Sequence, residues 1–147
     1  MVEETKKQRQ YIEQERGRVA WQDVRYVKGK SDTLEKEYRS LARSLNAMIQ
    51  INGLGQTLGF LKAKGKSDRN KAHYLVLQHL TEWMQNPEHF KATNNSIMTD
   101  VHDGLLRWVT DSETSSADYR RATTEVMAFG AWLRRFAEAE LKEPDNE

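Results

Sequence analysis

The chain has 147 residues, the usual size of one domain, and 37% hydrophobic residues are enough for one core despite 31% charged residues. It contains no cysteine, which excludes a disulfide framework, a thiolate zinc site and a cysteine nucleophile, and is typical of a reducing cytoplasm. The N-terminus is charged and no apolar run reaches about 20 residues, so we expect neither export nor a membrane anchor.

The net charge of +1 is divided unevenly along the chain. Residues 1–71 carry 16 Lys and Arg against 9 Asp and Glu, a net +7, whereas residues 72–147 carry 7 against 13, a net −6. A chain of this kind can bind a polyanion with one region and a basic partner, or its own copies, with another. The alternative is that these charges only solvate the surfaces of long helices.

Helical periodicity dominates the first half of the chain. A first helix is predicted over about residues 4–28, where Ala20, Val24 and Val27 form an apolar stripe and Gly29 can end the helix. Ser31 and Asp32 can cap a second helix, in which Asp32 and Glu35 have capping-box spacing. Asn46 is a candidate break before a third helix that ends near residue 65, and the alternative is a continuous or merely kinked helix.

The second half predicts three further helices. The fourth spans about residues 70–86 and is stopped by Pro87, and the fifth is capped by Asn94 or Asn95 and continues to about residue 109. The sixth spans about residues 117–142. The prediction is an all-α fold, a compact single-domain bundle of about six helices over residues 1–147, with about 4–142 ordered between short tails.

The third predicted helix contains three glycines, Gly53, Gly55 and Gly59. Each weakens an isolated helix by up to about 1 kcal/mol relative to alanine. Glycines four residues apart remove side-chain bulk from one face, so either another helix or a nucleic-acid backbone can approach closely there.

The sequence contains only weak patterns for catalytic chemistry. His73 and His79 lie six residues apart and therefore on opposite faces of one helix, and His79 belongs to the apolar stripe. His102-Asp103 is the dipeptide with which HD-type metal-dependent phosphohydrolases bind metal, with an earlier histidine (His73 or His79) and a later aspartate (Asp111 or Asp118) as further ligands. Among 22 acidic residues this pattern arises readily by chance, so we predict no catalytic residue, no metal and no cofactor.

The densest positive segment lies between the third and fourth predicted helices and contains a single acid, Asp68. Cations and free helix-end amides can meet a phosphate backbone at such a junction, and affinity would then fall steeply with salt. Arg18, Arg25 and Lys28 of the first helix are expected to extend the same field. The alternative is a surface that only aids solubility.

Two stretches, residues 38–65 and 119–141, carry a more specific pattern. The residues that define it are Asn52, Gly53, Leu54, Gln56, Phe60, Lys62 and Lys64, followed by Tyr119, Glu125, Trp132, Leu133, Arg134, Arg135 and Ala137. In this order they resemble the small helical subunit of the Cmr complex, the type III-B CRISPR effector that uses guide RNA to recognise and silence invading RNA. The resemblance spans about residues 19–141. Members of that family often have a proline where this chain has Asn46-Ala47.

The resemblance implies a non-enzymatic bundle that stacks with further copies of itself and lines the groove where target RNA pairs with guide RNA. It also implies that cleavage and signalling belong to other subunits. Which residues touch RNA is a prediction from charge. The first candidates are Arg18, Arg25, Lys62, Lys64, Lys66, Arg69 and Lys71, and the second are Arg134 and Arg135. An interaction module that contacts only proteins is the alternative.

Overall fold

The structure is a computed structural model that describes residues 2–93 and 98–145. Over these residues the chain forms helices and connections, without a strand. In chain order the helices are α1 (Val2–Val27), α2 (Asp32–Asn52), α3 (Leu54–Gly65), α4 (Ala72–Gln85), α5 (Gly104–Val109) and α6 (Ser116–Glu140). The predicted all-α fold with six helices is confirmed. None of the described helices combines the length and the apolar character needed to cross a bilayer.

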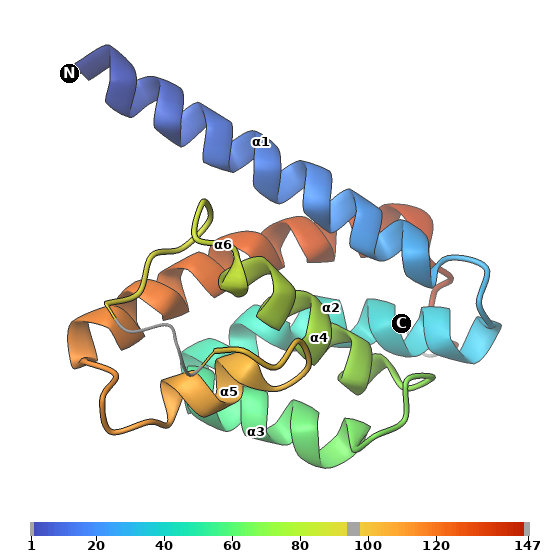
Figure 1. The fold of residues 1–147 in the computed structure, drawn as a ribbon. Helices are drawn as coiled ribbons and strands as arrows, with labels where there is room; N and C mark the ends of the chain where they lie inside the picture. Colours follow the sequence, from blue (N-terminus) through green and yellow to red (C-terminus); the bar gives the residue numbers. More distant parts are fainter. Residues whose placement is uncertain (1, 94–97, 146–147) are drawn as a thin grey trace.

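The helices pack around α4, which contacts α2, α3, α5 and α6 and contributes Leu77, Leu80 and Trp83 to the core. Figure 1 shows α1 on one side of the body, next to α6, and α3 on the opposite side. The first half of α1 projects beyond the body, and its residues 3–11 are all exposed. Because α1 and α3 lie on opposite sides, their basic residues face different surroundings.

The second helix does not end at Asn46. α2 continues to Asn52 because the side chain of Asn46 donates to the carbonyl oxygen of Met127 in α6 over 3.0 Å and does not compete with its own backbone. The break falls at Gly53, whose φ of 88° lies in the left-handed region that favours glycine. At the other end Ser31 is the cap, and its Oγ accepts from the backbone N–H of Leu34 over 3.1 Å. The capping box that begins at Asp32 is therefore not formed.

The fifth helix is much shorter than predicted. Its expected caps, Asn94 and Asn95, lie outside the described residues, and α5 begins only at Gly104. One carboxylate oxygen of Asp100 accepts the backbone N–H groups of His102 and Asp103 over 2.8 and 3.1 Å. These local bonds satisfy donors that a helix would otherwise use, so residues 98–103 form no helix before α5.

Glu125 of α6 connects three helices. Its carboxylate accepts two hydrogen bonds from the guanidinium of Arg16 in α1, over 2.7 and 2.8 Å, and one from the indole N–H of Trp83 in α4, over 3.0 Å. The Trp83 ring also stacks on Phe129 with the ring centroids 4.6 Å apart. A bidentate pair of this kind fixes orientation as well as distance, so Glu125 sets where α1 crosses the body.

A second polar group lies between α1, α2 and α4. The hydroxyl of Tyr38 and Nδ1 of His79 share a hydrogen bond of 2.7 Å, and His79 Nε2 lies 3.9 Å from an oxygen of Asp23. Burial, and secondarily the charge of Glu82, raises the pKa of Asp23 from 3.8 to about 8. Burial lowers the pKa of His79 from 6.5 to about 3, so the folded chain favours the neutral form of both side chains.

The change Glu125→Gln is expected to lower the free energy of unfolding by about 2 kcal/mol, because it leaves the poorly exposed guanidinium of Arg16 without its main counter-charge. Urea denaturation followed by tryptophan fluorescence measures this loss. The matched control is Glu13→Gln, since Glu13 contacts the same guanidinium at 3.1 Å but is mostly exposed, so its loss should stay below about 0.5 kcal/mol. Equal losses would contradict the role assigned to Glu125.

The change Asp23→Asn is expected to make stability less dependent on pH between about pH 4 and pH 8. The folded chain holds the Asp23 proton more tightly than the unfolded chain, because the pKa is raised, so this stabilisation is complete below pH 4 and is lost as the pH rises through 8. The depressed pKa of His79 acts in the opposite sense, and its stabilisation is lost as the pH falls from 6.5 towards 3.

Asparagine keeps the shape of the protonated carboxyl group and carries no charge. At pH 9 the free energy of unfolding of the Asp23→Asn variant should therefore be at least about 1 kcal/mol higher than that of the natural chain. The difference should shrink towards pH 5. Unfolding in urea at pH 5, 7 and 9 provides the measurement. The exposed Glu113 gives a control, since Glu113→Gln should shift stability by the same small amount at each pH. A difference for Asp23→Asn that does not grow with pH would refute the assignment.

Candidate nucleic-acid interface

The connection between α3 and α4 has a well-defined geometry. A Cβ atom on Gly65 would lie 2.6 Å from the backbone nitrogen of Tyr74, so only glycine allows the end of α3 to approach the start of α4 this closely. Lys66 ends α3 with a φ of 49°, and its N–H donates to the carbonyl oxygen of Lys62 over 2.9 Å. Asp68 accepts the backbone N–H of Asn70 over 2.9 Å. The backbone of the turn therefore has a defined conformation.

Four cations of this turn are exposed, and we call them the basic surface: Lys64, Lys66, Arg69 and Lys71. Within residues 2–93 and 98–145, no carboxylate lies at ion-pair distance from any of their charged groups, and the ammonium of Lys71 contacts only the carbonyl oxygen of Lys64, at 3.5 Å. The one acid of the segment, Asp68, is engaged with the backbone. The positive charge of the basic surface therefore remains available to an external anion.

Lys62 differs from these four cations. Its ammonium lies 3.2 Å from Asp103, a carboxylate that also pairs with Arg107 at 3.1 Å. This ion pair connects α3 to the start of α5. Asp103 is buried and Lys62 is half-buried. The sequence pattern does not reveal the contact, since the two residues are 41 positions apart.

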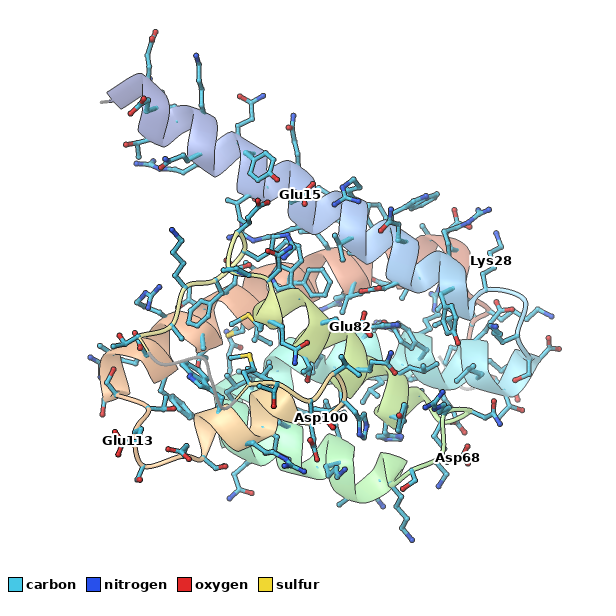
Figure 2. The ribbon with its side chains drawn as sticks, in the orientation of Figure 1. Glu15, Lys28, Asp68, Glu82, Asp100 and Glu113 are labelled. Carbon is cyan, nitrogen blue, oxygen red and sulfur yellow. The ribbon has the colours of Figure 1, made fainter. Side chains whose placement is uncertain are left out.

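The cations of α1 do not extend the basic surface, contrary to expectation. Arg18 donates two hydrogen bonds of 2.8 Å to Glu15, and Arg25 lies 3.9 Å from Glu140 of α6 and over the ring of Trp21. Lys28, at the end of α1, is 2.6 Å from the same carboxylate of Glu140. Figure 2 places Lys28 on the upper side of the body and Asp68 on the lower side. The α1 cations thus belong to a separate surface and are partly neutralised.

The second-ranked candidates lie on α6. Arg134 and Arg135 are both exposed, and Arg134 lies 3.3 Å from Glu138 one turn later. Arg135 has no ion pair among the residues that the structure describes.

The glycines of α3 have two different surroundings. The backbone N–H of Gly55 donates to the hydroxyl of Tyr119 over 2.8 Å, and a Cβ atom at Gly55 would lie 3.3 Å from that oxygen. Close packing therefore explains Gly55. At Gly59, no other part of the described chain comes within 4 Å of the position of a Cβ, so its surface is open.

An aromatic pair beside the basic surface was not predicted. The rings of Phe60 in α3 and His73 in α4 are 5.5 Å apart and nearly perpendicular, and Phe60 is 38% exposed. Burial lowers the pKa of His73, and the charges of Lys64 and Lys71 lower it further, against an opposite effect of Glu37. The four-residue spacing of Gln56, Phe60 and Lys64 is the signal that could have shown a common exposed face.

The residues of the HD pattern point in different directions. His79 lies in the core against Tyr38, whereas His102 stacks on Tyr74 with the ring centroids 3.8 Å apart. Asp103 is paired with Lys62 and Arg107, and Asp118 accepts the N–H of Thr93 and pairs with Arg121. Over the described parts of the chain, no three His, Asp or Glu side chains gather as a metal site would require.

Comparison with known proteins gives consistent matches. The sequence model of a family described as CRISPR-associated protein (Cas_Cmr5) matches residues 12–140. A curated relative, CRISPR system Cmr subunit Cmr5 of Thermus thermophilus, is 29% identical over 109 residues, which are 73% of this chain and 77% of that protein.

A solved structure also matches. The crystal structure of a CRISPR-associated Cmr5 family protein from Thermus thermophilus has a TM-score of 0.65 and 26% identity, over 89% of this chain and 98% of that one. The same helical arrangement is therefore found in an experimental structure. Because the family match spans most of the chain and the fold agrees with it, this protein belongs to the Cmr5 family, the small subunit of the type III-B CRISPR effector (Cmr) complex.

Proposed function

We propose that this chain is a non-catalytic, cytoplasmic subunit of a Cmr complex that contacts guide or target RNA through the basic surface and stacks with further copies of itself. The observation that supports RNA contact most directly is the set of exposed cations on the α3–α4 turn, which have no carboxylate partner in the described chain. Several cations elsewhere, such as Arg16 and Lys28, are paired with acids. Unpaired cations on a fixed turn suit a phosphate backbone.

Contact with RNA rather than with an acidic protein is favoured by the shape of the surface. The four cations lie within eight consecutive residues, so several of them can contact successive phosphates of one RNA strand. An acidic protein partner is the alternative. RNA competes with it for the same side chains, so addition of RNA to a complex held by such a partner would release that partner.

Self-association is proposed at the projecting half of α1. Residues 3–11 carry charged and polar side chains on all faces, and a helix of this kind is stable when it bridges to another body. Between this segment, residues 87–91 and the start of α6 lies an open groove of about 1220 Å³, whose lining includes Tyr11, Ile12 and Phe90. These partly apolar walls offer a second copy a contact that the described part of the chain leaves uncovered.

The variant with Lys64→Glu and Lys66→Glu is expected to bind RNA at least about 10-fold more weakly in the assembled complex near 0.1 M salt. It should also show a shallower salt dependence, because fewer counterions are released when fewer phosphates are neutralised. Filter binding of a labelled target RNA at several salt concentrations measures both quantities.

The matched control is Arg134→Glu with Arg135→Glu, which changes the net charge by the same amount on α6. Since Arg134 already pairs with Glu138, this control should lower the affinity less than about 3-fold. An unchanged affinity in the first variant, or equal losses in both, would show that the basic surface is not the RNA contact.

The change Tyr11→Ala is expected to reduce the number of copies of this chain in each complex, because tyrosines in interface grooves contribute strongly to association. Native mass spectrometry counts the copies. Tyr26→Ala is the control, since Tyr26 is similarly exposed on the same helix but lies outside the groove, and it should leave the copy number unchanged. A full complement of copies with Tyr11→Ala would exclude the groove as the contact between copies.

A further inference from the structure

One face of α3 combines three kinds of side chain that recognise nucleic acids. Gln56, Phe60 and Lys64 are spaced by four residues, so they lie about 6 Å apart along one side of the helix, and all three are exposed. The opposite side of α3 is anchored in the core by Leu54, Leu58 and Leu61, which are 0% exposed. This exposed face, which we call the α3 face, therefore has a fixed orientation.

The aromatic ring on the α3 face is held in place but not covered. The edge-to-face contact with His73, 5.5 Å between centroids at 75°, restrains the ring of Phe60 while 38% of the residue stays exposed. The neighbouring Gly59 adds no side chain to this part of α3. The exposed part of the Phe60 ring is therefore open to a flat molecule.

Two lysines and one acid lie near this ring. Lys64 lies one helical turn beyond Phe60, and Lys71 immediately precedes α4, whose first turn carries His73. The charges of Lys64 and Lys71 lower the pKa of His73, and the charge of Glu37 raises it by more than either lysine lowers it. A purely apolar partner would have to desolvate these lysines, whereas a phosphate-linked base would neutralise them while its ring stacked.

This inference rests on the RNA contact proposed above. The exposed ring and the lysines beside it indicate which class of RNA is bound. We propose that Phe60 is a stacking platform for an unpaired base of single-stranded RNA, with Lys64 and Lys71 on the flanking phosphates. A base inside a duplex already stacks on both faces and is inaccessible to a ring on a helix surface, so the site selects single-stranded RNA over paired RNA. Gln56 lies where its amide can reach the edge of a neighbouring base.

The test uses the full-length chain and two fluorescent RNA probes at about 0.1 M salt. One is a single-stranded 12-mer with a central 2-aminopurine, and the other is a blunt duplex of the same length. Phe60→Ala is expected to weaken binding of the single strand at least about 10-fold, because a base loses its stacking partner, and to leave duplex binding and the salt dependence unchanged. Phe60→Trp restores an aromatic surface and should retain the affinity and the quenching of 2-aminopurine.

The outcomes separate this inference from the proposed function. If Lys64→Glu with Lys66→Glu weakens RNA binding but Phe60→Ala does not, the stacking platform is wrong and the RNA contact stands. If neither variant weakens binding, both proposals fail. If Phe60→Ala releases another protein subunit from the complex while RNA binding stays unchanged, the ring is a protein contact and the inference is overturned. A melting temperature of the Phe60→Ala variant within a few degrees of that of the natural chain confirms that the comparison is made on folded protein.

Discussion

The carboxylate of Glu125 is the constraint on which the arrangement of the long helices depends. It receives Arg16 from α1 and Trp83 from α4, while its own helix α6 packs along α1 and α2. A charge in such a poorly exposed position is tolerated only with a matched partner, so these side chains specify one orientation of α1. The projecting half of α1, and with it the groove beside residues 87–91, follows from that orientation.

The two stretches that carry the family pattern serve different purposes in the structure. The second builds the fold: Tyr119 accepts the N–H of Gly55, Glu125 joins three helices, and Trp132 covers Gly17 at 3.3 Å from the position of a Cβ. The first contributes Leu54 and Leu58 to the core and also presents Phe60 and Lys64 on the exposed side of α3. The two are coupled, because the hydroxyl of Tyr119 fixes the start of α3 directly after the turn at Gly53.

Periodicity in the sequence predicted the helices and much of the core, because burial of one face repeats every three to four residues. It failed where a local side chain or a distant partner decides the outcome. Asp100 keeps residues 98–103 out of a helix, and Asn46 is accommodated in a helix because α6 supplies an acceptor. The candidate site was predicted in part: the charge of residues 62–71 is visible in the sequence, whereas the pairing of Lys62 with Asp103 is a tertiary contact that no spacing rule contains.

The rigidity of the α3–α4 turn bears on how effectively its charges can act. Binding costs free energy when loops and side chains must be ordered, so cations on a preorganised turn bind phosphates more tightly than the same cations on a flexible loop. Here the backbone of Gly65 lies close to that of Tyr74, Asp68 accepts the backbone N–H of Asn70, and Lys66 adopts a positive φ. The remaining entropic cost of binding comes from ordering the lysine side chains. Their conformational freedom lets them adjust to phosphates at different positions.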